Sequence, residues 1–305
     1  MCNYAPIVIF AYNRADRLEA LLESLESNNN TEYMRLFIFV DVPNPKDRKN
    51  RKYNEEVKKF VYDYKGRNQR FKSITVIVAE SHKGLAESVI SGVSQVIQKY
   101  GKVVVLEDDL EVSNDFLDYM QRGLDFYKND KRVWALSGHC PQMNILTHYK
   151  KDVFLAPRVE SIGWGTWKDR WNRTDWQMTS YKKFKRDILG RAIFNLGGND
   201  LTGMLAHQME DKKYDSWAIR WCYQEFLERK YTVYPRESRV IHCGNDGRST
   251  HGCYFSTQNL KENYRRCQFV FVKPDFRMIW NFRKVNSVPF IKRLIAHYLP
   301  VMWII

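Results

Sequence analysis

The sequence predicts an α/β protein whose central sheet is doubly wound and mostly parallel. Short apolar runs rich in β-branched residues alternate with amphipathic segments of helical periodicity through the first third of the chain. The apolar runs are unbroken, which is typical of strands buried on both faces of a parallel sheet. Polar and charged residues follow each run directly, at the strand ends where open α/β sheets bind ligands.

The elements of the first half follow from these patterns. Strands are expected at residues 6–12, 36–40, 74–79 and 103–106, with helices over 15–27, 47–66 and 85–100. Asn13 is a candidate N-cap for the first helix, and Gly101 is a suitable residue to end the third. This β-α-β-α-β-α-β order predicts right-handed crossovers.

The second half has a different character. Residues 133–137 are expected to form another strand, and 233–235 and 240–242 are expected to be short strands or extended pieces. Residues 154–181 are rich in glycine and tryptophan. Such a stretch is either a tryptophan-filled core layer or a loop in which backbone approaches a ligand and an indole forms one wall.

Two polar features of the second half are candidates for function. A helical segment is expected to begin near Asp215, which is either an N-terminal charge for that helix or a general base between two aromatic residues. Residues 244–252 form a polar, glycine-rich stretch of a kind suited to folding over phosphates.

Three adjacent acids, Glu107, Asp108 and Asp109, come directly after the strand at residues 103–106. Adjacent carboxylates repel one another and gain nothing from a core, so a solvated acidic turn is one interpretation. The other is a divalent cation held between them and a polyphosphate, since hard cations take carboxylate and phosphate oxygens. Asp109, as an acid at a strand end, is expected to lie at the surface.

The other strand ends offer further polar side chains for the same rim of the sheet. These are Asn13 and Arg14, then Asp41, then His82 and Lys83. The sequence contains neither G-x-G-x-x-G nor G-x-x-x-x-G-K-[ST], so neither a dinucleotide-binding nor a P-loop site is supported.

Charge and cysteine content restrict the class of partner. The 305 residues carry a formal charge of +14, which implies an anionic partner such as a phosphorylated substrate, an acidic membrane or nucleic acid, but no nucleic-acid motif is found.

The six cysteines are scattered and predict reduced thiols in a cytoplasmic protein. His242 and Cys243 fit no standard zinc template. No apolar window reaches the ~18 residues of a membrane span.

The acidic triplet with its flanks resembles the inverting GT-A glycosyltransferases, and most closely the N-acetylglucosaminyltransferase I family. The segment 107–112, followed by Asp115-Phe116, is similar to that family's version of the Asp-x-Asp metal motif. Further pieces match in order over about residues 5–255: the first strand with Asn13-Arg14, Gly163-Trp164, and Asp215-Ser216-Trp217 with Arg220 and 235–239. Tyr214 and Ser216 stand where the family pattern has Trp and a second Asp.

The resemblance implies a GT-A fold and a set of roles. Asp109 would be the direct Mn²⁺ or Mg²⁺ ligand, Glu107 and Asp108 would contact the donor ribose and sugar, and Asp215 would deprotonate the acceptor hydroxyl. Arg14 and Asp41 would hold the nucleotide base, and the donor site would also include Lys83, Gly163 and Trp164.

The chain is expected to divide into three regions: a nucleotide-sugar-binding half at residues 1–130, an acceptor and catalytic-base half at 131–270, and a basic amphipathic tail at 271–305. In the tail, residues 289–299 are expected to form a helix with apolar residues on one face and Lys292, Arg293 and His297 toward the other, and Trp303 follows. This helix either packs on the catalytic domain or lies on an anionic membrane, in which case removal of residues 286–305 would release the protein from liposomes.

Together these features predict a metal-dependent inverting hexosyl- or N-acetylhexosaminyltransferase. It would move a sugar from a UDP-sugar to a saccharide or lipid-diphosphate-linked acceptor in bacterial surface polysaccharide synthesis, without nucleic acid, in the cytoplasm or at the inner membrane face. A sugar-nucleotidyltransferase would need a glycine-rich loop near the first strand, yet residues 8–17 contain no glycine. A catalytically inactive carbohydrate- or nucleic-acid-binding protein is the other alternative, against which Asp109 and Asp215 argue.

Overall fold

The structure is a computed structural model that describes residues 4–211, 215–243, 259–261 and 264–287. The glycine-rich stretch 244–252 and the tail from residue 288 lie outside the described residues, so the interpretations given for them stay predictions. Among the described residues, no helix has the length and apolar character needed to cross a membrane.

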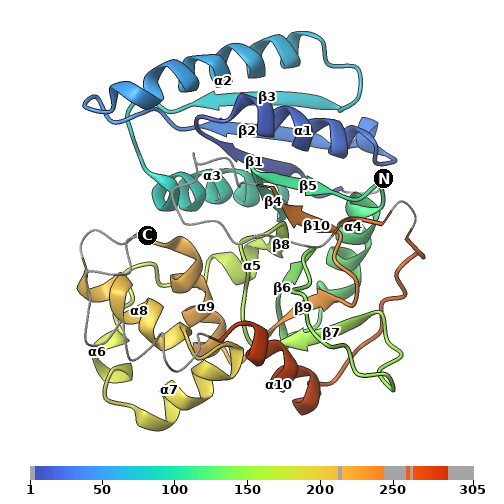
Figure 1. Cartoon of the computed structure of the whole chain (residues 1–305), viewed down its shortest axis with the longest axis vertical. Helices are drawn as coiled ribbons and strands as arrows, with labels where there is room; N and C mark the ends of the chain where they lie inside the picture. The colour runs from blue at the N-terminus through green and yellow to red at the C-terminus, as the bar shows by residue number, and fades with distance from the viewer. Residues whose placement is uncertain (1–3, 212–214, 244–258, 262–263, 288–305) are drawn as a thin grey trace.

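A single eight-stranded sheet, in the order β3-β2-β1-β4-β8-β6-β9-β7, organises the described chain (Figure 1). Its first half is parallel, and β6 and β9 run in the same direction, whereas β8 and β7 run against their neighbours. The strands are β1 (Ile7–Ala11), β2 (Arg35–Val40), β3 (Ser73–Val78), β4 (Lys102–Glu107), β6 (Val133–Ser137), β7 (Val153–Ala156), β8 (Trp164–Trp167) and β9 (Tyr231–Pro235). The predicted α/β class and mostly parallel sheet are confirmed.

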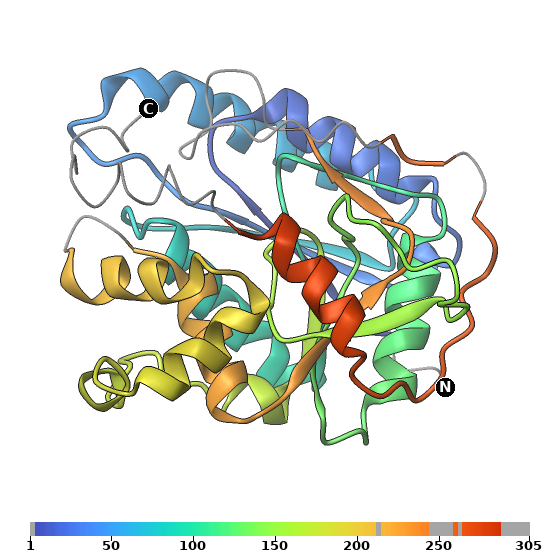
Figure 2. The same ribbon diagram turned by 60° about the horizontal axis from the view of Figure 1, so that its bottom comes forward.

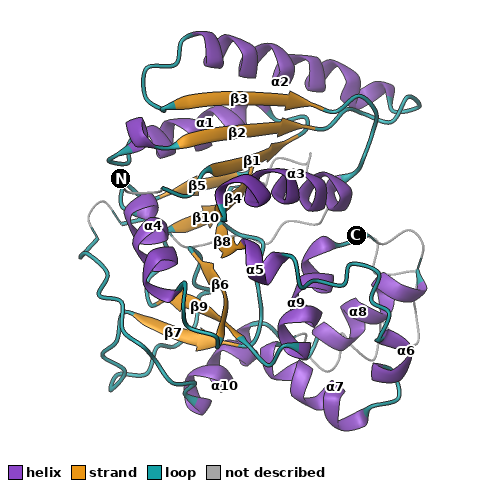
Figure 3. Ribbon diagram, turned by 180° about the vertical axis from the view of Figure 1, so that it is seen from behind, coloured by secondary structure: helices purple, strands orange, loops and turns teal. Residues whose placement is uncertain are grey.

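Helices cover both faces of this sheet (Figure 3). In the first half they are α1 (Ala15–Glu26), α2 (Arg48–Gly66), α3 (Leu85–Tyr100) and α4 (Phe116–Tyr127). In the second half they are α5 (Lys168–Trp171), α6 (Tyr181–Phe184), α7 (Ile188–Phe194), α8 (Leu201–Glu210), α9 (Trp217–Leu227) and α10 (Phe276–Val285), with the 3₁₀ turns η1 (Thr31–Tyr33) and η2 (Asn195–Gly197).

The unbroken apolar strands are buried because each serves two cores. Ile7 and Ile9 of β1 pack with α1, α2 and α4, whereas the intervening Val8 and Phe10 pack with α3 and α9. Alternate side chains of a strand point to opposite faces, so both sets must be apolar. Gly92 of α3 permits the close packing, since a Cβ there would lie 2.7 Å from the Phe10 ring.

The predicted boundaries of the first half agree with the structure to within one or two residues. Gly101 ends α3 in the left-handed region at φ 78°, as expected of a helix-terminating glycine. The N-cap prediction is wrong: Arg14 occupies that position, and the Asn13 side chain instead donates to Asn50 Oδ1 on α2. The Asn13 side chain is engaged by Asn50 in the first turn of α2, and it therefore does not cap α1.

The tryptophan-rich stretch is mainly core. Trp164 of β8 is almost fully buried and stacks on Trp171, with Trp217 and Trp221 of α9 at ring distances of 5.1 and 4.5 Å. Of the two interpretations of this stretch, the tryptophan-filled core layer is therefore the one that applies to these indoles. The cluster joins α9 to the sheet and so fixes the helix that follows Asp215.

A second, two-stranded sheet stands beside the end of β4. It pairs β5 (Leu110–Val112) antiparallel with β10 (Val240–His242), with His242 opposite Leu110. Periodicity predicted β10 as an extended piece without a partner, because its partner lies about 130 residues earlier in the chain.

Glu225 of α9 is a buried carboxyl whose titration should make stability pH-dependent. It is 1% exposed, and its one described partner is the Thr232 hydroxyl, which donates at 2.7 Å. Burial raises the pKa of Glu225 well above its ordinary value of 4.5. Between these two pKa values the folded chain keeps a proton that the unfolded chain releases, so the free energy of unfolding should fall as pH rises.

Glu225→Gln keeps an acceptor for Thr232 and removes the titration. Relative to wild type, the variant should therefore gain stability with rising pH, by at most about 1.4 kcal/mol per pH unit inside that window. Urea unfolding across the range from mildly acidic to mildly alkaline pH measures this. Glu228→Gln, at the more exposed end of the same helix, is the control, and a Glu225→Gln slope equal to the wild-type slope would show that the carboxyl is already ionised.

Candidate active site

The acidic triplet lies where the ends of β4 and β1 meet. Glu107 is paired with Phe10 in the sheet, and the Asp108 amide donates to the Phe10 carbonyl at 3.1 Å. The chain leaving β1 returns the contact, because the Tyr12 amide donates to Asp108 Oδ2 at 3.1 Å. The parallel pairing of β1 with β4 thus brings residues 12–14 against the acids, whereas the sequence predicted a parallel sheet without its strand order.

Arg14 is held between two of the acids. Its guanidinium lies 2.5 Å from Asp108 Oδ1 and 3.0 Å from Asp109 Oδ2. Burial opposes its charge, but the neighbouring carboxylates outweigh burial and raise the pKa of Arg14 above its ordinary value. The sequence predicted Arg14 at this rim of the sheet. In the structure its side chain faces Asp108 and Asp109.

His242 is the site residue that sequence reasoning missed. Its Nε2 lies 3.0 Å from Asp109 Oδ2, and the next amide, that of Cys243, donates to the Asp109 carbonyl at 2.7 Å. Pairing of β10 with β5 delivers both contacts. In the sequence, His242 is marked only by the apolar pair Val240-Ile241 before it, and nothing there connects it with the triplet.

Asp109 has one oxygen that the described protein leaves without a hydrogen bond. Oδ2 meets Arg14 and His242, whereas the buried Oδ1 has no hydrogen-bond partner among the described residues. The expectation of a surface acid is wrong, since Asp109 is 6% exposed beneath β10. Burial raises its pKa, but the hydrogen bond from His242 and the charge of Arg14 lower it below the ordinary value, so Asp109 is an anion.

The other two acids are held less firmly as anions. Burial, reinforced by the charges of Asp109 and Asp108, raises the pKa of Glu107 to about 8. Burial also raises the pKa of Asp108 to about 6, against the opposing charge of Arg14. Three carboxyls facing one guanidinium leave room for further positive charge, and a cation nearby would return both pKa values toward normal.

These residues fit a divalent cation bound together with a substrate. Asp109 supplies an ionised carboxylate with an unpaired buried oxygen, and His242 supplies a ring nitrogen beside it. Within the described ranges, no group of three or more His, Cys, Asp or Glu side chains is arranged to hold a metal alone. A cation here would therefore complete its shell with phosphate oxygens and water, as Mg²⁺ commonly does.

Asp41 is engaged by backbone amides. Its carboxylate accepts from Val42 at 2.9 Å, from Lys83 at 3.0 Å and from Gly84 at 2.8 Å, and His82 lies 3.2 Å away. Asp41 thereby ties the turn before α3 to the end of β2. The Lys83 side chain is exposed and donates to Ser91 at 3.2 Å.

Gly163 brings backbone close to the same edge. Its carbonyl accepts from the Gly138 amide at 2.7 Å, and its φ of 61° places it in the left-handed region. A Cβ there would lie 3.1 Å from Val240, the first residue of β10. Because the Trp164 indole is in the core, any donor contact by this pair would come from backbone atoms.

Asp215 is exposed at the start of α9. Ser216 is the N-cap of that helix, accepting from the Ile219 amide, and Asp215 accepts from the Arg220 guanidinium at 2.6 Å. The helix therefore does not use Asp215 as its cap, and the 60% exposure of the side chain leaves it accessible to a substrate.

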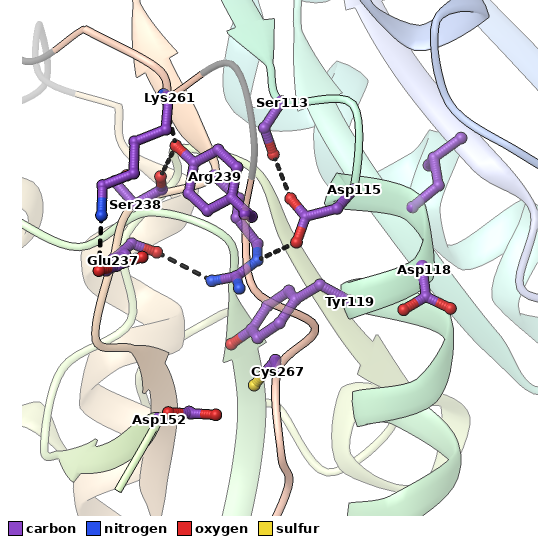
Figure 4. Close-up of polar contacts among 12 residues, drawn as sticks. Ser113, Asp115, Asp118, Tyr119, Asp152, Glu237, Ser238, Arg239, Lys261 and Cys267 are labelled. Carbon is purple, nitrogen blue, oxygen red and sulfur yellow. Dashed lines mark hydrogen bonds and ion pairs between the residues drawn. The ribbon is translucent and has the colours of Figure 1, made fainter. Parts of the chain in front are cut away.

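A buried network holds β10, and with it His242, in place (Figure 4). Arg239 donates to Asp115 Oδ2 and to the Glu237 carbonyl, both at 3.0 Å, and its guanidinium lies 4.6 Å from the centre of the Tyr119 ring. Ser113 donates to the second Asp115 oxygen at 2.7 Å. Neither the Arg239 nor the Asp115 role was predicted from sequence, since the partners lie on distant segments.

Asp115→Ala should destabilise the fold. The substitution leaves the Arg239 side chain, which is 4% exposed, without its carboxylate. Loss of one partner from a buried ion pair costs about 3 kcal/mol. Urea unfolding measures the change, with Asp118→Ala on the exposed side of α4 as the control. A loss of unfolding free energy no larger than that of Asp118→Ala would show that water can take the place of the Asp115 carboxylate as the partner of Arg239.

The GNT-I family model matches residues 1–175, which is more than half of the chain. The alpha-1,3-mannosyl-glycoprotein 2-beta-N-acetylglucosaminyltransferase of Arabidopsis thaliana is 23% identical over 192 residues, 55% of this chain and 41% of that protein. The chain therefore matches about two fifths of that relative's length.

Solved structures of S. aureus TarS are also similar. One is 10% identical with a TM-score of 0.43, over 78% of this chain and 36% of that one. TarS 1–349 in complex with UDP is 12% identical with a TM-score of 0.41, over 78% and 59%.

The family match places the protein in the glycosyltransferase class, and the GT-A type sheet expected from the sequence is the one observed. More narrowly, the chain belongs to the GNT-I family. The acidic triplet, Arg14 and Trp164 lie inside the matched range, whereas Asp215 and His242 lie outside it.

Proposed function

We propose that the protein transfers a sugar from a nucleotide-sugar to an acceptor hydroxyl, with inversion at the anomeric carbon and with Mn²⁺ or Mg²⁺. The observation that carries the proposal is Asp109, an ionised, buried carboxylate with one unpaired oxygen at the end of β4. A solvated acidic turn would not bury this group beneath β10 between Arg14 and His242.

Donor binding is assigned to the rim around the triplet. Asp109, with His242 beside it, would hold the cation, which when bound neutralises charge on the leaving diphosphate. Asp108 and Glu107 would accept hydrogen bonds from ribose and sugar hydroxyls. Arg14, which is shared between Asp108 and Asp109, would also contact the donor. Lys83 and the backbone of Gly163 would form the rest of the donor site.

Asp215 is assigned as the base. A carboxylate that takes the acceptor proton must be accessible and oriented. Its exposure meets the first need, and the 2.6 Å contact with Arg220 meets the second. One oxygen is fixed by Arg220, which leaves the other for the incoming hydroxyl.

The substrates are assigned by chemistry and by relatives. The Arabidopsis relative is named an N-acetylglucosaminyltransferase, and one TarS structure holds UDP. We therefore propose a UDP-linked hexose or N-acetylhexosamine as donor, and a saccharide or lipid-diphosphate-linked acceptor of surface polysaccharide synthesis at the inner membrane face. The excess of 14 positive charges favours such anionic substrates.

A donor screen tests the proposal. Purified protein is incubated with several UDP- and other nucleotide-sugars, with Mn²⁺ or with EDTA, and release of the nucleoside diphosphate is measured. Release from one donor class that depends on the cation is expected. Release of pyrophosphate from a sugar phosphate and a nucleoside triphosphate would instead identify a nucleotidyltransferase, and no turnover of any donor would favour a binding protein.

A further inference from the structure

Helices α7 and α10 lie at the opposite end of the molecule from α2 (Figures 1 and 3), and both carry exposed apolar side chains. On α7, Ile188 is 80% exposed and Leu189 is 71% exposed, and Ile193 is also exposed. On α10, Phe276 is 69% exposed and its ring stacks on that of the exposed Trp280. Large apolar side chains grouped in this way mark an interaction surface.

The two helices are neighbours because both pack against η2 near their C-terminal ends. Arg283 of α10 donates to the Asn195 carbonyl at 2.8 Å, and Asn195 directly follows α7. Figure 2 turns this end of the molecule toward the viewer, with α10 in front. We call Ile188, Leu189, Ile193, Phe276 and Trp280, with the basic residues around them, the docking surface.

Basic residues flank these apolar residues in the sequence. Residues 182–193 contain five Lys or Arg against one Asp, and residues 273–285 contain four against one. Both acids are engaged in capping: Asp187 accepts from the Gly190 amide, and Asp275 accepts from the Arg277 and Met278 amides. Lys185 is paired with Glu210 of α8 at 2.6 Å, and the basic residues of these segments still outnumber the acids.

The combination of exposed apolar residues with basic residues indicates what binds to the docking surface. Protein–protein interfaces are depleted in lysine at their centres, whereas the exposed residues Lys182, Lys183 and Lys185 come shortly before Ile188 and Leu189 in the sequence here. Apolar and aromatic side chains within a basic surround are the pattern of a segment that lies in the headgroup region of an anionic bilayer. From α10 the chain continues into residues 288–305, whose sequence again combines basic residues with Trp303.

We propose that this docking surface binds anionic membrane, with Ile188, Leu189, Phe276 and Trp280 entering the headgroup region and the basic residues facing lipid phosphates. The proposal does not depend on the transferase reaction, because it is tested by binding alone. It places the contact on folded helices of the described chain, whereas periodicity singled out the tail.

Vesicle sedimentation of the full chain tests the proposal. Phosphatidylcholine vesicles with about 30% phosphatidylglycerol should carry wild-type protein to the pellet, vesicles of phosphatidylcholine alone should not, and high salt should weaken the binding. Ile188→Ser/Leu189→Ser, and separately Lys182→Gln/Lys183→Gln/Arg186→Gln, should each weaken binding by about tenfold or more. All these side chains are exposed, so the fold should be kept, as circular dichroism can verify.

Matched variants on α2 separate a local surface from overall charge. Tyr62→Ser removes an exposed apolar side chain there, and Lys49→Gln/Lys52→Gln/Lys59→Gln removes the same number of charges as the triple variant. Both controls should bind like wild type. Equal losses in surface and control variants, or no binding of wild type, would overturn the proposal. A vesicle-independent dimer that Ile188→Ser/Leu189→Ser converts to monomer would overturn it in favour of a second copy.

Discussion

Asp109→Asn is expected to abolish sugar transfer while the protein stays folded. The amide keeps an oxygen for Arg14 and His242 but removes the negative charge that a divalent cation requires. Loss of charge stabilisation on the leaving group is worth several kcal/mol, so turnover should fall about 10³-fold or more. Initial rates of diphosphate release at saturating donor and Mn²⁺ measure the effect.

Stability must be measured alongside, because Asp109 is buried between Arg14 and His242. We expect a loss of about 1–2 kcal/mol in the free energy of unfolding, the range for a weakened buried hydrogen bond. Asp63→Asn, an exposed acid on α2, is the control and should leave turnover unchanged. Wild-type turnover by a folded Asp109→Asn protein would remove Asp109 from the metal site.

Asp215→Asn is expected to lower turnover by about 10²–10⁴, the range for loss of a general base. Donor binding should change little, since the assigned donor site lies at the ends of β1 and β4. Transfer rates at saturating donor and acceptor give the first quantity, and calorimetric titration with donor in the presence of Mn²⁺ gives the second.

Glu210→Gln is a close control for Asp215→Asn. Glu210 is also half exposed, lies on the neighbouring helix α8, and makes a 2.6 Å ion pair with Lys185, as Asp215 does with Arg220. The control should transfer sugar at the wild-type rate. Weakened donor affinity together with normal turnover at saturation would give Asp215 a binding role in place of the catalytic one.

The first half of the fold could be predicted because its information is local. An unbroken run such as Val103–Leu106 specifies a strand buried on both faces, and the helices between the strands carry their own periodicity and end signals. The rule that polar residues at the ends of parallel strands share one rim put Arg14 and the acids at the same rim, and the pairing of β1 with β4 brings them into contact.

The rest depended on distant segments that periodicity does not connect. The pairing of β10 with β5 spans about 130 residues, and it alone brings His242 to Asp109 and Arg239 to Asp115. Trp164 shows the opposite difficulty: a glycine-tryptophan pair fits both a ligand wall and a core layer, and only packing against Trp171 and Trp221 decides between them.

Binding of Mn²⁺ in the presence of UDP tests the central claim most directly, because it needs neither the donor sugar nor the acceptor. Electron paramagnetic resonance follows free Mn²⁺ as protein is added. Wild-type protein with UDP should remove the free-ion signal, Asp109→Asn with UDP should leave it close to the protein-free level, and Asp215→Asn should behave like wild type. Equal uptake of Mn²⁺ by wild type and Asp109→Asn would contradict a cation site at the end of β4.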